Sequence, residues 1–121
     1  MYTLYNIMIM QQLDSTFAAL ADPTRRAILA RLADGEATVM GLAEPFEISQ
    51  PAISRHLKVL ENAGLITRRV DGAKHPRRLS KAGIDAIDQW LGMLREAMAK
   101  NYDRLDKVLE TMKTEDGEDI R

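Results

Sequence analysis

The chain has 121 residues, of which 45% are hydrophobic and 29% are charged, and its formal net charge is −1. These values are typical of one globular domain with a modest core and argue against a disordered or fibrous chain. The chain has no cysteine, which excludes disulfides, thiolate metal sites and cysteine nucleophiles, and its two histidines leave few ligands for a metal.

The N-terminal stretch "MYTLYNIMIMQQLD" is apolar but carries no basic residue and no small-residue cleavage site. Gln11 and Gln12 interrupt it long before it reaches the length of a membrane span. We therefore expect neither a signal peptide nor a membrane partner, and a cytoplasmic location.

Two helices are predicted first. Leu13, Phe17 and Leu20 recur at the spacing that lines up one face of a helix. Asp22 is a typical N-cap for the next helix, and Pro23 fits its first position, where the missing N–H costs nothing. That second helix has its own apolar stripe of Ile28, Leu29 and Leu32.

A short third helix and a longer fourth helix follow. Thr38 can cap the third, which ends near Pro45, and Ser49 can cap the fourth, over residues 49–63, with Pro51 in its first turn. In the fourth helix, one face is apolar and is formed by Ile53, Leu57 and Leu60. The opposite face is polar and basic, which burial alone does not explain.

A hairpin over residues 65–79 is predicted after Gly64, with a β-branched run, the turn "DGAK" and a returning strand "HPRRL". Ser80 can then cap a long helix over residues 81–112, followed by a polar tail at 113–121. Residues 1–112 would form one domain.

The charges are distributed unevenly along this order of elements. Residues 49–80 contain seven basic and two acidic side chains, a net charge of +5, whereas the segments before and after them are each acidic, at −3. A basic block between acidic flanks is expected when one surface meets a polyanion. Clustering on one helix and its hairpin favours nucleic acid over a merely solvated face.

Short helices, then a hairpin, then a further helix is the order of a winged helix-turn-helix, a mainly α fold with a small β-hairpin wing. The helix at 49–63 would enter the major groove of double-stranded DNA, with Gln50, Ser54 and Arg55 able to reach base edges. Ser49, His56 and Lys58 suit phosphates better, although this division is open. The wing would add backbone or minor-groove contacts through Arg68, Arg69, Lys74, Arg77 and Arg78.

At these residues the chain closely resembles the ArsR family of small bacterial winged-helix repressors. The resemblance is carried by "ALADPTRRAILARL", "SQPAISRHLKVLENAGLI" and "TRRVDGAKHPRRL", in that order, and covers roughly residues 13 to 112. It implies a homodimer that binds a near-palindromic operator and is released by a signal.

The chain departs from the pattern of the metal-sensing members of that family. Those members carry cysteines on the helix before the reading helix, where this chain has Thr38 and Met40. A second familiar site uses Asp and His residues of the final helix, but both histidines here, His56 and His75, lie in the basic block. We therefore expect no metal site, no cofactor and no metal response, and the sequence shows no inducer site.

The final helix predicts a dimer. Its apolar residues alternate spacings of three and four, and only Asn101 interrupts them. The apolar stripe runs for about eight turns, which is longer than one small domain can cover. With the first helix as a second layer, the predicted interface comprises Leu13, Phe17, Ile84, Ile87, Leu91, Leu94, Met98, Asn101 and Leu105. The alternative is that this stripe only covers its own domain. A two-fold dimer would place its reading helices about 34 Å apart, one turn of DNA.

Smaller alternatives concern the histidines and methionines. His56 and His75 could titrate or bind metal, but neutral hydrogen bonding is the simpler role. Met8, Met10, Met93 and Met98 could line a ligand pocket, but adaptable packing at a core or dimer seam explains them better.

Two rival functions remain. An enzyme would need a phosphate loop or a nucleophile with its base, and neither pattern is present. A protein-contact module with the same fold would not need the basic wing. The sequence therefore favours a dimeric, sequence-specific transcriptional regulator, most simply a repressor, that is not an enzyme.

Overall fold

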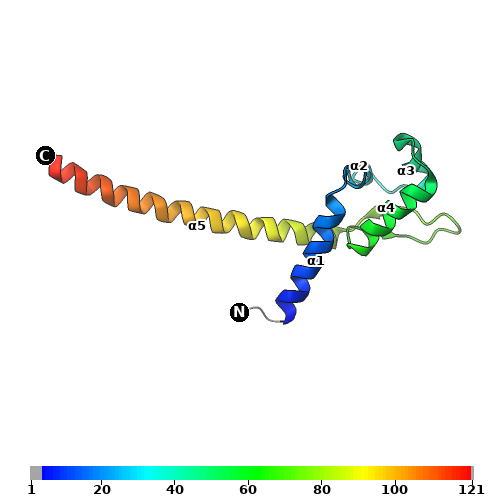
Figure 1. Ribbon diagram of the computed structural model, residues 1–121, viewed down its shortest axis with the longest axis horizontal. Coiled ribbons are helices and arrows are strands. Elements are labelled where there is room, and N and C mark those ends of the chain that lie inside the picture. Colours follow the sequence, from blue (N-terminus) through cyan, green and yellow to red (C-terminus); the bar gives the residue numbers. More distant parts are fainter. Residues whose placement is uncertain (1–3, 121) are drawn as a thin grey trace. The chain divides into compact units, whose positions relative to one another are not determined.

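The computed structural model describes the backbone of residues 4–120 and the side chains of Leu4 and residues 11–114. Its elements are α1 (Leu4–Leu20), α2 (Pro23–Leu32), α3 (Val39–Phe46), α4 (Gln50–Asn62), β1 (Ile66–Arg68), β2 (Arg77–Leu79) and α5 (Lys81–Ile120) (Figure 1). The mainly α fold with a small hairpin is therefore confirmed. The chain forms two compact units, Met1–Ile87, here called the winged unit, and Asp88–Arg121, here called the distal α5 segment.

Four helices begin at the predicted caps. The backbone N–H three residues into each helix donates to the side-chain oxygen of the cap, which replaces a hydrogen bond that the first turn lacks. The capping distances are 3.0 Å at Asp22, 3.2 Å at Thr38, 3.3 Å at Ser49 and 3.3 Å at Ser80. The sequence located these starts because capping is a local interaction.

The core of the winged unit lies between α2, α3, α4 and the start of β1. Its largest fully buried side chains are Ile28, Leu42, Ile53, Leu57, Leu60 and Leu65. Complete burial of one such side chain contributes roughly 1.5–3 kcal/mol, so this cluster is the main source of stability for the unit. Three of its members come from α4, which fixes the face of α4 that points inward.

The end of α4 is a crowded junction. Gly64 has a φ of 76°, a conformation that favours glycine, and it ends the helix as predicted. A Cβ on Gly83, in the first turn of α5, would collide with the carbonyl oxygen of Gly64. From α1, Gln12 Nε2 donates to the Ala63 carbonyl oxygen at 3.0 Å, and the buried Thr16 hydroxyl lies 3.4 Å from the same oxygen. Small residues and side-chain donors thus hold α1 and α5 against the end of α4.

The hairpin is the predicted wing, with strands of three residues each. Its antiparallel register pairs Ile66 with Leu79 and Arg68 with Arg77. Ala37, in the connection between α2 and α3, adds an isolated bridge to Arg77, with backbone hydrogen bonds of 3.0 and 2.8 Å. This bridge joins the base of the wing to the helical part of the unit.

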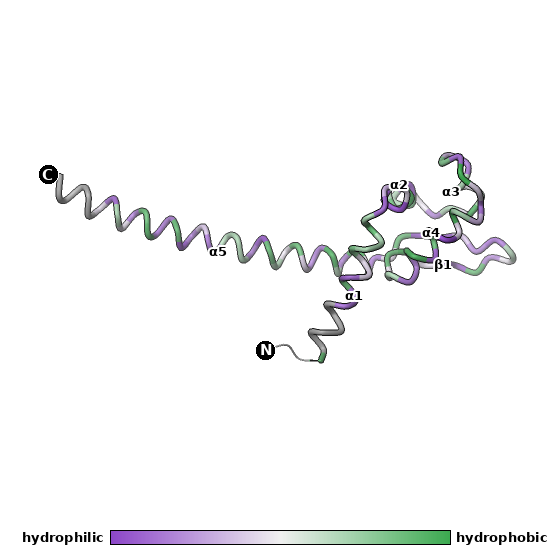
Figure 2. The backbone as a smooth tube through the Cα atoms, viewed as in Figure 1, coloured by the Kyte–Doolittle hydropathy of each residue, from purple (hydrophilic) through white to green (hydrophobic). Residues whose placement is uncertain are grey.

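Helix α5 continues to Ile120, past residue 112, where we expected a polar tail. In the distal α5 segment, all residues from 88 to 114 are exposed except Trp90, which is half-buried. Apolar and polar residues alternate along the helix as far as its side chains are described (Figure 2). Within the described residues, no helix is both long and apolar enough to cross a bilayer.

Candidate nucleic-acid interface

Helix α4 has two chemically different faces. Ile53, Leu57 and Leu60 are fully buried in the core. The exposed residues at its start and on its other face are Ser49, Gln50, Ser54, Arg55 and Lys58. Because the core fixes the rotation of α4, these polar side chains are presented to solvent as a group.

Among the described residues, four cations on α4 and the wing have no protein partner. In the part of the chain that the structure describes, the side chains of Arg55, Lys58, Arg68 and Lys74 are exposed and have no hydrogen bond or ion pair. An unpaired guanidinium or ammonium retains all its donors for an external acceptor such as a phosphate or a base edge.

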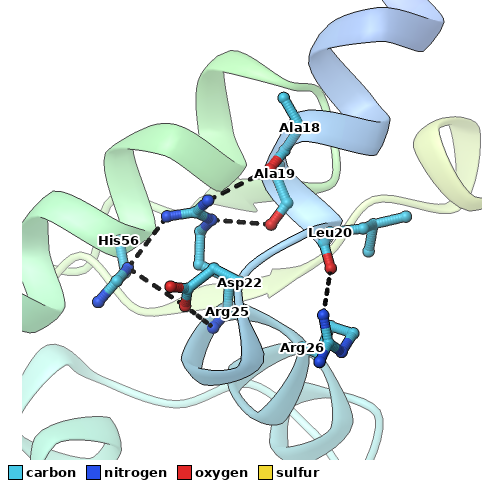
Figure 3. Close-up of polar contacts among 7 residues, drawn as sticks. All are labelled: Ala18, Ala19, Leu20, Asp22, Arg25, Arg26 and His56. Atoms are coloured by element: carbon cyan, nitrogen blue, oxygen red, sulfur yellow. Dashed lines mark hydrogen bonds and ion pairs between the residues drawn. The ribbon is translucent and has the colours of Figure 1, made fainter.

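His56 lies differently from the rest of the predicted reading residues. Its side chain is 24% exposed and its Nδ1 lies 3.3 Å from Arg25 Nη1 and 3.9 Å from Asp22 Oδ2, both on the α2 side (Figure 3). The backbone N–H of Arg25 lowers the pKa of Asp22 below its usual value, since the hydrogen bond favours the carboxylate. His56 therefore already has partners within the protein.

Arg77 is also occupied by the protein. Its side chain is only 11% exposed, its Nε donates to Glu61 Oε1 at 2.9 Å, and its Nη1 donates to the His75 carbonyl oxygen at 2.7 Å. Since Glu61 belongs to α4, the contact between Nε and Oε1 attaches β2 to that helix. They favour a structural role for Arg77.

The remaining wing arginines are intermediate cases. Arg69 donates two hydrogen bonds to the Glu36 carboxylate, at 2.6 and 3.3 Å, and it remains 43% exposed. This pairing lowers the pKa of Glu36 and raises that of Arg69. Arg78 Nε makes a longer contact of 3.4 Å with the Thr67 hydroxyl. Arg69 and Arg78 are thus accessible but partly engaged.

The predicted dimer-interface residues differ in exposure: two are half-buried and the others are exposed. Leu13 and Ile87 are half-buried, and Ile87 packs against the core of the winged unit. Phe17 and Ile84 are 37% and 39% exposed. The other predicted positions, Leu91, Leu94, Met98, Asn101 and Leu105, are all exposed in the distal α5 segment.

Sequence reasoning missed three residues that organise this surface. Glu36 and Glu61 hold Arg69 and Arg77, and Arg25 contacts His56 across 31 positions of the chain. None shows a local pattern, because each partner comes from a different element. Among the described residues, no group of three or more His, Cys, Asp or Glu side chains is placed to hold a metal ion.

Known proteins with similar sequences include bacterial transcriptional regulators. A family model described as bacterial regulatory protein, arsR family, matches residues 22–68, from the cap of α2 to the end of β1. HTH-type transcriptional regulator Rv2034 of Mycobacterium tuberculosis is 45% identical over 74 residues, 61% of this chain and 69% of that protein. The arsenical resistance operon repressor of Staphylococcus xylosus is 37% identical over 87 residues, 72% of this chain and 84% of that protein.

The chain belongs to the ArsR family. A crystal structure of the ArsR family transcriptional regulator RHA00566 has a TM-score of 0.68 and 39% identity, and covers 74% of this chain and 92% of the other. As in other ArsR-family regulators, α3, α4 and the hairpin of this chain form a winged helix-turn-helix. These related proteins are DNA-binding transcriptional regulators and not enzymes, which confirms that expectation for this chain.

Proposed function

We propose that this ArsR-family regulator binds a near-palindromic operator as a homodimer and represses transcription by occupying the promoter. The observation that carries the proposal is the group of exposed, unpaired cations on α4 and the wing, on a helix whose opposite face is locked in the core. Binding to chromosomal DNA places the protein in the cytoplasm.

The contacts within the protein divide the predicted DNA-binding residues. Gln50, Ser54 and Arg55 would read base edges, since amide, hydroxyl and guanidinium groups match the donors and acceptors of the major groove. The phosphate-binding set would comprise Ser49, Lys58, Arg68, Arg69, Lys74 and Arg78. Arg77 and His56 would act from inside the protein, because their side chains are already engaged there.

The exposed stripe of the distal α5 segment supports the homodimer. The leucine and methionine side chains at positions 91, 94, 98 and 105 are 37–54% exposed. They would be buried if they packed against the same side chains of α5 in a second copy of the chain. A two-fold homodimer contains two copies of α4, one for each half of a near-palindromic operator. The exposed Phe17 of α1 would add to this interface.

We further propose that the releasing signal is not a metal ion. The chain has no cysteine, Thr38 caps α3 with its hydroxyl, and Met40 is exposed. Both histidines lie outside α5. An inducer of another kind would have to bind the DNA-incompetent conformation better than the competent one.

The test is selection from a pool of random duplex DNA, followed by binding to the enriched sequence over a series of salt concentrations. We expect an inverted repeat with half-sites about 10 base pairs apart and an affinity that falls steeply with salt, as several phosphate contacts require. Absence of enrichment at every salt concentration would overturn the proposal and favour a protein-contact function for the same fold.

A further inference from the structure

A single arginine of α2 joins three helices of the winged unit. The Arg25 guanidinium donates through Nε to the Ala19 carbonyl oxygen at 2.8 Å and through Nη2 to the Ala18 carbonyl oxygen at 3.2 Å. Its Nη1 lies 3.3 Å from His56 Nδ1 on α4 (Figure 3). The end of α1, the start of α2 and the middle of α4 therefore meet at one side chain.

We propose that Arg25 is a positioning residue for DNA reading: it holds the reading helix α4, through His56, in a fixed orientation on the end of α1. The proposal rests on the function proposed above, in which α4 reads the operator. It assigns a role to a residue that makes no DNA contact itself.

The chemistry at both ends of the link is directional. Carbonyl groups at the end of a helix lack partners within the helix and carry partial negative charge, so a cation is favoured there. The planar guanidinium has its donors in a fixed fork, which orients Nη1 once Nε and Nη2 are bound. The position of His56 Nδ1 is thus set relative to the end of α1.

The histidine must accept this hydrogen bond. A guanidinium has only donors, so the contact is a hydrogen bond in the tautomer in which Nδ1 is the acceptor and the ring proton of neutral His56 lies on Nε2. In this tautomer Nδ1 has no proton to donate to Asp22 Oδ2, which lies 3.9 Å away and instead accepts the Arg25 backbone N–H at 3.0 Å.

The link also acts close to the reading residues. His56 follows Ser54 and Arg55 directly on α4, whereas the buried Ile53 and Leu57 on the core face make non-directional apolar contacts. Apolar packing fixes which face of α4 points into the core, and the directional hydrogen bond to Arg25 further restricts small rotations and shifts of the helix about that position. Loss of this constraint should weaken recognition of the correct sequence more than attraction to DNA in general.

The neighbouring Arg26 provides a matched control. Its Nη1 donates to the Leu20 carbonyl oxygen at 2.8 Å, so it also binds the end of α1, but it is exposed and makes no hydrogen bond or ion pair with α4 among the residues that the structure describes. An effect that came only from capping α1 would therefore appear equally in Arg26→Ala and Arg25→Ala.

The experiment measures affinity for the selected operator and for random duplex DNA in wild type, Arg25→Ala, His56→Ala, the double variant and Arg26→Ala. We expect Arg25→Ala and His56→Ala each to lower operator affinity about tenfold, with random-DNA affinity changed less than about twofold. The double variant should lose no more than either single variant, because both break one link. His56→Asn, whose Oδ1 can replace Nδ1 as acceptor, should retain most of the affinity.

Several results would overturn the proposal. Additive losses would mean that His56 contacts DNA independently, and an equal loss in Arg26→Ala would reduce Arg25 to a helix cap. If Arg25→Ala does not fold, Arg25→Lys, which keeps the charge and loses the fork, takes its place with the same expected loss of preference. A wild-type protein without sequence preference would overturn the proposed function itself, whereas a normal preference in Arg25→Ala would overturn only the role of Arg25.

Discussion

The winged unit and the distal α5 segment contain similar apolar side chains in opposite environments. In the winged unit, Ile53, Leu57 and Leu60 of α4 are fully buried by the same chain. In the distal segment, Leu91, Leu94 and Met98 remain 37–54% exposed. The first region therefore satisfies its own hydrophobic pattern, and the second carries a pattern that requires another surface.

This difference indicates what each region is for. Apolar residues at alternating spacings of three and four form the seam of paired helices, and contiguous exposed apolar surface is uncommon unless it is an interface. Stability of the winged unit should therefore depend on its own core, whereas assembly should depend on α5. Substitutions in the two regions should therefore change stability and assembly separately.

The largest effect should come from a charge in the α5 seam. Leu94→Glu should raise the dimer dissociation constant about a thousandfold or more, because interface truncations at central positions cost about 2–4 kcal/mol and a two-fold dimer contains the change twice. Sedimentation velocity over a concentration series measures it. Met93→Glu is the control. Packing at a seam was one expectation for Met93, but its side chain is 56% exposed and it does not follow the spacing of three and four that joins Leu91, Leu94 and Met98. Equal dissociation constants for the two variants would contradict the assignment of the seam.

A cavity in the core of the winged unit should lower its stability without affecting assembly. Leu57→Ala should lower the free energy of unfolding by about 2–5 kcal/mol, because Leu57 is fully buried. Urea denaturation at one protein concentration measures this loss. In protein that is still folded, the dimer dissociation constant should stay within about threefold of wild type. A larger change in dimerisation than in unfolding would mean that the two regions are not separate.

The polar residue in the α5 seam should set the alignment of the two helices. Asn101→Leu should strengthen association by about 1.5–3 kcal/mol while loosening the control of register, since a polar seam residue specifies alignment at a cost in stability. Distances between spin labels at exposed α5 positions report register. A single unchanged distance with stronger association would show that Asn101 does not set the register.

The smallest effect should come from the cap of the reading helix. Ser49→Ala removes the oxygen that accepts the Ala52 N–H and should destabilise the winged unit by about 0.5–2 kcal/mol. Thermal unfolding measures this change. Ser49→Asp, which restores an acceptor, should recover most of the loss in stability, and failure to recover it would point to a role of the hydroxyl other than capping.

Local patterns predicted the fold well because its helix starts depend on local chemistry. Asp22, Thr38, Ser49 and Ser80 cap within three residues, and Gly64 ends α4 through its own backbone conformation. The length of α5 was underestimated, because the polar stretch after residue 112 resembles a tail yet remains helical to Ile120.

The candidate site was harder to predict, because contacts with residues of other elements decide which of its side chains are free to bind DNA. Nothing in "HPRRL" distinguishes Arg77, which is held by Glu61, from Arg78, which is exposed. His56 looks like its exposed neighbours in the sequence, but its position in the helical turn directs it toward α2. Composition and order thus located the surface, and contacts between distant elements decide which side chains remain available on it.

If the exposed face of α4 reads DNA in two symmetric copies, the base preference of the protein should depend on the side chains of that face. The selection from random duplex DNA would be repeated with Arg55→Ala, with Arg77→Ala as a control. We expect Arg55→Ala to relax preference at one symmetry-related position in each half-site, with a loss of about 1–3 kcal/mol in operator affinity, and Arg77→Ala to enrich the wild-type site. If Arg55→Ala enriches the wild-type site with unchanged base preference at every position, Arg55 on the exposed face of α4 does not read DNA.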